Sequence, residues 1–158
     1  MAIDKVTEYF KSFGMDNKIL QFDVSSATVA LAAEALGCEP ERIAKTLCFK
    51  KDDGCVLIVA AGDAKVDNSK FKSFFGFKAK MPSGDEVEEL CGHAIGGVCP
   101  FAVKEGVEVF LDVSLNRFDT VFPACGSSNS AIELTVEQLK EYSKCNTVID
   151  VCKGWQEQ

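Results

Sequence analysis

The sequence predicts a mixed α/β (α+β) fold, in which helices flank a curled, partly barrelled mixed sheet. The first observation is an alternating segment, residues 44–50, that a turn at residues 51–54 joins to a continuous apolar run over residues 55–61. Alternation is typical of a strand with one buried face, and a continuous apolar run of a strand covered on both faces. The second observation is that strand-like segments outnumber what one flat sheet holds comfortably, while helices interrupt them irregularly.

The first forty residues predict two helices with a short strand between them. Apolar residues recur at helical spacing in the first helix, and alanines dominate the second. Ser25 and Ser26 offer an N-cap to the second helix, and Gly37 offers a stop. These elements are expected at residues 4–13, 19–22 and 28–36, followed by a short helical turn opened by Pro40.

After the hairpin, helix starts are marked by side chains that accept hydrogen bonds from backbone amides. Asp67 precedes one helix, Ser83 and Glu86 form a capping box, and Thr135 with Gln138 forms another. Helices are therefore expected at residues 68–75, 84–90 and 136–142. Apolar segments between them predict strands at residues 77–80, 107–113, 120–123, 131–134 and 146–151.

Length and hydrophobicity predict one domain over residues 1–158. The chain holds no 18-residue apolar run, and its start lacks a charged region followed by an apolar stretch. We therefore expect no membrane partner and a cytoplasmic location. The oligomeric state stays open.

Composition also narrows the cofactors and partners. Eight cysteines are present, but no pair has the C-x-x-C spacing of zinc sites and dithiol redox motifs, so we expect no metal and no cofactor. The net charge of −7 argues against general coating of nucleic acid. Residues 39–80 nevertheless carry nine Lys and Arg against six Asp and Glu. These cations form either a local basic face or a set of solvated side chains.

The most informative stretch is residues 92–101, Gly-His-Ala-Ile-Gly-Gly-Val-Cys-Pro-Phe. Glycine allows close approach to the main chain, and Pro100 restricts its own φ and the conformation of Cys99. Such a turn can leave backbone N–H groups free to bind a carbonyl oxygen or an oxyanion. The alternative is an ordinary tight turn between two elements.

Three other positions have two possible roles each. Lys45 lies on an apolar strand face, where its side chain either reaches water or meets an anion. Asp112 ends an apolar strand, where its carboxylate either orients a ligand or caps the next element. The loop that contains Gly126 and Ser127 either adds polar groups to a site or only turns the chain.

Cys99 and His93 raise the possibility of a thiol nucleophile with its general base. They are six residues apart on a glycine-rich loop, and His93 is the single histidine of the chain. The other seven cysteines have the pattern of small buried hydrophobic residues. A Cys–His hydrolase is therefore an alternative, alongside a purely structural role.

The order of these segments resembles the YbaK/ProX family of aminoacyl-tRNA deacylases, which includes the editing domain associated with prolyl-tRNA synthetase, here in a free-standing form. The resemblance extends from about residue 7 to residue 142. The segments that carry it are Arg42-Ile43-Ala44-Lys45-Thr46-Leu47, the turn at residues 92–100, the strand ending at Asp112, and the region from Gly126 to Leu134.

The resemblance implies a deacylase that acts in trans on a small amino acid mischarged on the 3′ acceptor end of a tRNA, with tRNA-Pro favoured. Lys45 would engage the terminal nucleotide, while the backbone of a Gly-x-x-x-Pro loop would hold the ester carbonyl and water, with help from the substrate. The implied catalytic residues are Lys45, Gly96, Gly97, Val98, Cys99 and Pro100. The implied substrate-binding residues are Phe22, Cys48, His93, Asp112, Gly126 and Ser127.

Three positions depart from the family pattern. His93 stands where many relatives have tyrosine, Phe22 stands near a tyrosine that some carry, and Ala131 stands where some have an acidic residue. These departures argue against cysteine specificity and for another small amino acid. The alternative to an enzyme is a homologue without catalytic activity, which binds a tRNA end or a synthetase.

Overall fold

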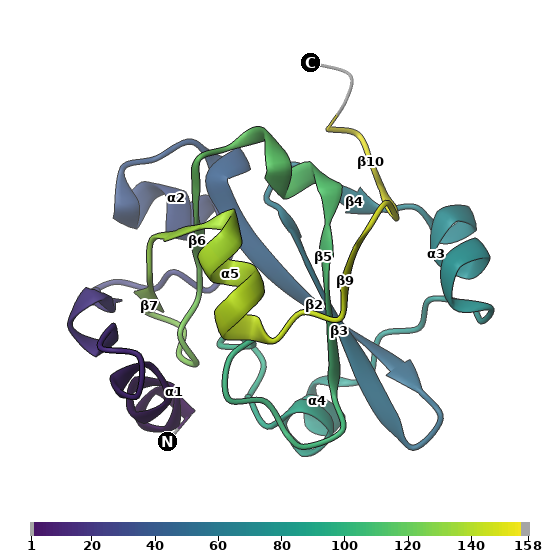
Figure 1. The fold of residues 1–158 in the computed structure, drawn as a ribbon, viewed down its shortest axis with the longest axis horizontal. Coiled ribbons are helices and arrows are strands. Elements are labelled where there is room, and N and C mark those ends of the chain that lie inside the picture. Colours follow the sequence, from purple (N-terminus) through teal and green to yellow (C-terminus); the bar gives the residue numbers. More distant parts are fainter. Residues whose placement is uncertain (1, 156–158) are drawn as a thin grey trace.

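The computed structural model describes residues 2–155, and its centre is a curled six-stranded mixed sheet (Figure 1). The strand order is β8-β6-β2-β3-β5-β9. The predicted hairpin forms the middle of this sheet, because β2 (Ile43–Lys51) and β3 (Gly54–Ala61) pair antiparallel along their whole length. The other members are β5 (Glu108–Asp112), β6 (Thr120–Pro123), β8 (Leu134–Thr135) and β9 (Thr147–Ile149).

The sheet is mixed because connections of different lengths join its strands. β5 runs parallel to β3, β9 runs parallel to β5, and β6 runs parallel to β2, whereas β8 pairs antiparallel with β6. Two short antiparallel pairs lie outside it. They join β1 (Leu20–Gln21) to β7 (Ser130–Ala131), and β4 (Lys65–Val66) to β10 (Cys152–Lys153). The predicted class of fold is therefore confirmed.

Within residues 2–155, five α-helices flank the sheet, close to their predicted positions (Figure 1). Thr28 is the N-cap of the second helix, in place of the predicted Ser25 and Ser26, and both predicted capping boxes are present. None of the helices in the described part of the chain is long and apolar enough to cross a membrane. The helices are α1 (Ala2–Lys11), α2 (Val29–Leu36), α3 (Asn68–Phe75), α4 (Gly84–Cys91) and α5 (Val136–Ser143).

Two strand predictions are wrong. Residues 77–80 form no strand, although the backbone amide of Lys50 donates to the Lys80 carbonyl at 2.8 Å. Residues 131–134 divide between β7 and β8, which pair with β1 and β6. A single apolar segment in the sequence does not reveal such a division, because each half is too short to show a period.

The core lies on both faces of the central hairpin. Leu57 and Ile58 are completely buried although neighbouring strand residues face opposite sides, so both sides of β3 are covered. On one side the ring of Phe49 packs against Phe71 of α3, with ring centroids 4.9 Å apart. The opposite face of β2 carries Ala44, Thr46 and Cys48, and this is the face that borders the candidate site.

Asp112 joins the end of β5 to two neighbouring segments. Its carboxylate Oδ2 accepts from the amide of Ser114 at 2.9 Å, in the first turn of a 3-10 helix, and Oδ1 accepts from the amide of Val151 at 3.0 Å. The side chain is completely buried. Of the two roles that the sequence left open, the geometry supports capping, since both carboxylate oxygens already bind backbone amides.

We expect Asp112→Ala to lower the free energy of unfolding by about 2–4 kcal/mol, because it removes a cap and leaves two buried amides without an acceptor. Asp112→Asn keeps one acceptor oxygen and should lose less. Urea unfolding followed by circular dichroism measures both variants. An alanine variant as stable as the parent would contradict this structural role.

Candidate functional site

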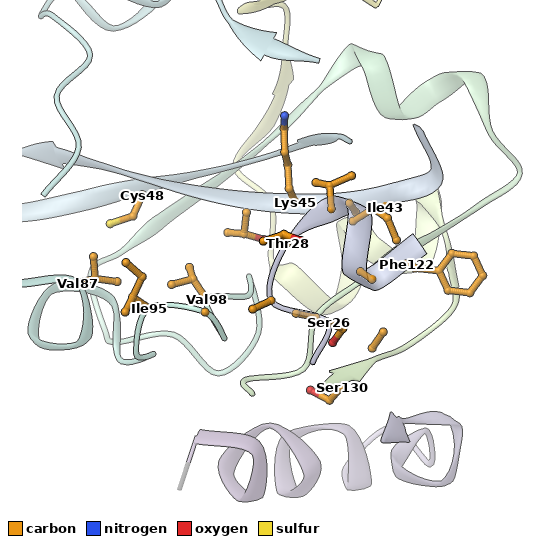
Figure 2. Close-up of a pocket in the computed structure, with 18 of the residues that line it drawn as sticks. Ser26, Thr28, Ile43, Lys45, Cys48, Val87, Ile95, Val98, Phe122 and Ser130 are labelled. Carbon is orange, nitrogen blue, oxygen red and sulfur yellow. The ribbon is translucent and has the colours of Figure 1, made fainter. Parts of the chain in front are cut away.

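A cavity of about 230 Å³ opens beside β2, between the start of α2 and the glycine loop (Figure 2). Its walls come from six segments of the sequence, which the sheet and α4 bring together: residues 26–32, 43–48, 81–87, 95–98, 122–124 and 130–131. Most of the lining side chains are apolar. The lining residues are Ser26, Ala27, Thr28, Val29, Ala32, Ile43, Ala44, Lys45, Thr46, Cys48, Met81, Pro82, Val87, Ile95, Gly96, Val98, Phe122, Ala124, Ser130 and Ala131.

The glycine loop forms one wall of this cavity. Gly92 ends α4 with φ +95°, and a β-turn follows in which the amide of Gly97 donates to the Ala94 carbonyl at 3.0 Å. Gly96 is the third residue of that turn, with φ +92°, as a type II turn requires. The turn thus explains the glycine at position 96 by backbone conformation alone.

Gly97 is required for a different reason, which is close packing. A Cβ atom on Gly97 would lie 2.8 Å from the carbonyl carbon and oxygen of Gly126 and 2.9 Å from Cα of Ser127. Any side chain there would push the loop away from the segment leading to β7. Gly126 and Ser127 therefore support the loop from behind.

Most backbone amides of the loop are left without partners. Within residues 2–155, the amides of residues 93–96, 98 and 99 donate to no backbone or side-chain acceptor, and Gly97 is the exception. Gly96 and Val98 both line the cavity. Free amides next to an apolar cavity are suited to binding a carbonyl oxygen that gains negative charge during a reaction.

Lys45 borders the cavity, but its ammonium group lies outside it. Figure 2 shows its side chain pointing to the opposite side of β2 from Cys48 and Val98. The Nζ atom donates to the Gly62 carbonyl at 3.3 Å, and burial lowers the pKa of this lysine. No carboxylate within the described chain forms a salt bridge with it, and the nearby Asp63 pairs with Arg117, so the one hydrogen-bond partner of the cation is a carbonyl.

Most polar side chains of the lining are already paired. Ser26 donates to the Ser128 carbonyl, the Thr28 hydroxyl caps α2, and the Ser130 hydroxyl bonds with Ser127. The Thr46 hydroxyl is buried and, in the described chain, has no partner. Thr46 was not predicted as a site residue, although it lies two residues before the predicted Cys48 and therefore on the same face of the strand.

The structure brings some of the predicted site residues together and separates others. Lys45, Cys48, Gly96 and Val98 line the cavity, while Gly97, Cys99, Pro100 and His93 belong to the loop but not to the lining. Phe22 lies outside the lining and exchanges two hydrogen bonds with Asn129, next to Ser130. Gly126 and Ser127 support Gly97, and Asp112 serves the end of β5.

Sequence analysis also missed two walls of the cavity. The sequence predicts only helix capping for the segment that contains Ser26 and Thr28. It gives no site prediction for Met81 and Pro82. Both walls come from connections between elements, whose direction a sequence pattern does not reveal. The signal that the sequence offers there is Met81, a large apolar residue directly before Pro82 in a connection.

Cys99 and His93 do meet, at 3.5 Å between Sγ and Nε2. However, the same Nε2 lies 2.7 Å from the Phe101 carbonyl, so it carries a proton and donates, and it cannot also accept one from the thiol. Burial raises the pKa of Cys99 to about 12, and burial lowers the pKa of His93. The pair is completely buried, as a thiol and a neutral imidazole. This geometry does not support a Cys–His hydrolase.

Residues 2–155 hold no group of three or more His, Cys, Asp or Glu side chains arranged to bind a metal ion.

Comparison with known proteins places the chain in a family. The model of the aminoacyl-tRNA editing domain matches residues 24–142, which include every residue that lines the cavity. The chain belongs to the aminoacyl-tRNA editing domain family. The resemblance inferred from the sequence is thereby confirmed.

Several relatives of this editing domain are known. The uncharacterized protein YwhH of Bacillus subtilis (strain 168) is 54% identical over 157 residues, which cover 99% of this chain and 100% of YwhH. The proline–tRNA ligase of Halalkalibacterium halodurans is 32% identical over 65% of this chain, and the match covers 18% of the ligase. A solved structure described as a candidate trans-editing enzyme for prolyl tRNA synthetase has a TM-score of 0.86 and 27% identity, with 97% of this chain and 98% of that chain covered.

One wall of the cavity of this editing domain is apolar. Ala131 lines the cavity and is buried. With Phe122 and Ala124 also apolar, no carboxylate lies among the lining residues. A positively charged ligand side chain would therefore find no counter-ion there.

We expect Cys99 to resist alkylation in the native protein, because the thiol is completely buried and its pKa of about 12 leaves almost no thiolate at neutral pH. Treatment with iodoacetamide at pH 7.5, followed by peptide mass spectrometry, measures this. The partly exposed Cys38 and Cys145 report on reagent access, and the unfolded protein gives full labelling. Labelling of Cys99 within minutes would instead indicate an activated nucleophile.

Proposed function

We propose that this editing domain is a deacylase that acts in trans on aminoacyl-tRNA and hydrolyses the ester of a small amino acid, with tRNA-Pro as the preferred carrier. The observation that carries the proposal is the pair of free amides at Gly96 and Val98 beside an apolar cavity of about 230 Å³. Family membership supports the reaction class. The relatives among proline–tRNA ligases support the choice of tRNA.

The cavity favours a small and uncharged aminoacyl group. Its volume of about 230 Å³ must hold the amino acid together with part of the ribose. Its floor is made of Ala44, Thr46 and Cys48, and no carboxylate or guanidinium contributes to the lining. Burial of a charged side chain without a partner in this cavity would cost several kcal/mol of binding free energy. Alanine, serine and threonine are the first candidates, and cysteine is the fourth, which the departures at His93, Phe22 and Ala131 make less suitable.

The chemistry needs only positioning and electrostatic stabilisation. The free amides donate to the ester carbonyl oxygen, and a water molecule attacks the carbonyl carbon. As the tetrahedral intermediate collapses, the bond to the ribose oxygen breaks and that oxygen takes a proton. The neighbouring ribose hydroxyl relays the proton from the water, because the lining supplies no side-chain base. The products are the free amino acid and the uncharged tRNA.

Recognition would be confined to the acceptor end. The net charge of −7 is unfavourable for extensive phosphate binding, while the +3 excess of residues 39–80 allows a few contacts. A cognate synthetase is a possible second partner. We place the activity in the cytoplasm, where charged tRNA is used.

The first test is single-turnover hydrolysis of tRNA-Pro carrying alanine, serine, threonine or cysteine. We expect the parent protein to shorten the half-life of at least one ester, whereas a homologue that only binds would leave all four unchanged. Gly97→Ala should lower kcat/KM about 100-fold, because the added Cβ displaces the loop from Gly126. Gly54→Ala is the matched control, since its Cβ would have no neighbour closer than 3.9 Å. Equal activity of the two variants would contradict the role of the loop.

Lys45 is proposed to bind the nucleotide at the edge of the cavity, which requires its ammonium to turn away from the Gly62 carbonyl. We expect Lys45→Met to raise KM about tenfold, with a smaller effect on kcat, because a cation without a carboxylate partner is lost. Thermal unfolding of the same variant separates this from a structural role. An unchanged KM with a lowered melting temperature would show that Lys45 only stabilises the end of β3.

A further inference from the structure

The mouth of the cavity carries two exposed apolar side chains that folding does not explain. Ile95 is 71% exposed and Met81 is 58% exposed, and both line the cavity. Of the large hydrophobic residues that are exposed in the described chain, only these two line the cavity. We call this pair the apolar lip. Because both side chains stand at the edge of one cavity, a ligand that enters the cavity would cover them.

Ile95 is held in place by the turn that displays it. It is the second residue of the β-turn closed by Ala94 and Gly97, a position where turns rarely place a branched aliphatic residue. The turn directs the side chain out of the loop, beside Val87 and Val98 (Figure 2). A Cβ atom at Gly84 would lie 3.6 Å from Ile95 Cδ1, so the isoleucine rests on the first residue of α4.

Met81 is presented on an equally constrained backbone. Pro82 follows it and favours an extended conformation, and the capping box at Ser83 then fixes the start of α4. Methionine adapts its shape to a partner because it is unbranched and polarizable. The lip thus combines one rigid and one adaptable side chain, and neither member carries a charge.

We propose that the apolar lip binds the adenine base at the 3′ end of the acceptor strand, as the surface that positions the substrate. This rests on the proposed function, in which the aminoacyl ester occupies the cavity. The base is then one ribose away from the ester, which places it at the mouth. Adenine is a flat, uncharged aromatic group that gains from contact with aliphatic side chains, whereas a phosphate would gain nothing from them.

The test compares two non-hydrolysable probes by fluorescence anisotropy. Both are acceptor-stem minihelices with alanine linked as an amide to the terminal ribose, one ending in adenosine and the other in an abasic ribose. We expect the parent to bind the adenosine probe about tenfold more tightly than the abasic one. Ile95→Ala and Met81→Ala should each weaken binding of the adenosine probe about three- to tenfold and leave the abasic probe unaffected.

Phe74→Ala is the matched control, because Phe74 is 49% exposed on α3 and does not line the cavity. It should preserve the preference for adenosine. Equal binding of the two probes by the parent would overturn the proposal. An unchanged preference for the adenosine probe in a double variant that carries both Ile95→Ala and Met81→Ala would also overturn it. So would sedimentation showing that the lip holds two copies of the chain together. If the parent prefers the adenosine probe but hydrolyses no ester, the proposed deacylase function is contradicted, whereas the proposal that the apolar lip binds adenine is supported.

Discussion

The close approach of Gly97 to the backbone of Gly126 and Ser127 is the constraint on which the site depends. At 2.8 Å from a Cβ position to main-chain atoms, no residue other than glycine fits without movement. This contact brings the loop after α4 against the segment before β7, although the two are almost thirty residues apart in the sequence. The cavity lies in front of that contact, bordered by Gly96, Val98 and Ser130.

The central strand supplies the other half of the arrangement. Its alternation sends Ala44, Thr46 and Cys48 toward the cavity, and sends Phe49 toward α3. A shift of one residue would exchange the two sets. The pairing of β2 with β3 over their full length prevents such a shift, so that hairpin fixes the floor of the cavity as well as the core.

The sequence predicted those features that have a local period or a local cap. The hairpin, the five helices and the glycine loop all belong to this group, and so does the face of β2 that Cys48 occupies. It did not predict the division of residues 131–134 between two sheets, nor the Gly62 carbonyl as the partner of Lys45, because both are decided by distant segments. The N-cap of α2 is Thr28, whereas Ser25 and Ser26 were predicted.

Asp112 and His93 illustrate why chemically active residue types are poor guides on their own. Each is completely buried, and each is bound to backbone atoms that hold a turn or a strand end, although Nδ1 of His93 has no partner in the described chain. The stronger signals are groups whose ordinary needs the fold leaves unmet: the free amides of Gly96 and Val98, and the exposed side chain of Ile95. A fold normally pairs its amides and covers its large aliphatic side chains. The site is therefore recognised by three exceptions to that rule within four residues of one loop, at the point where a carbonyl oxygen and an apolar ring would satisfy them.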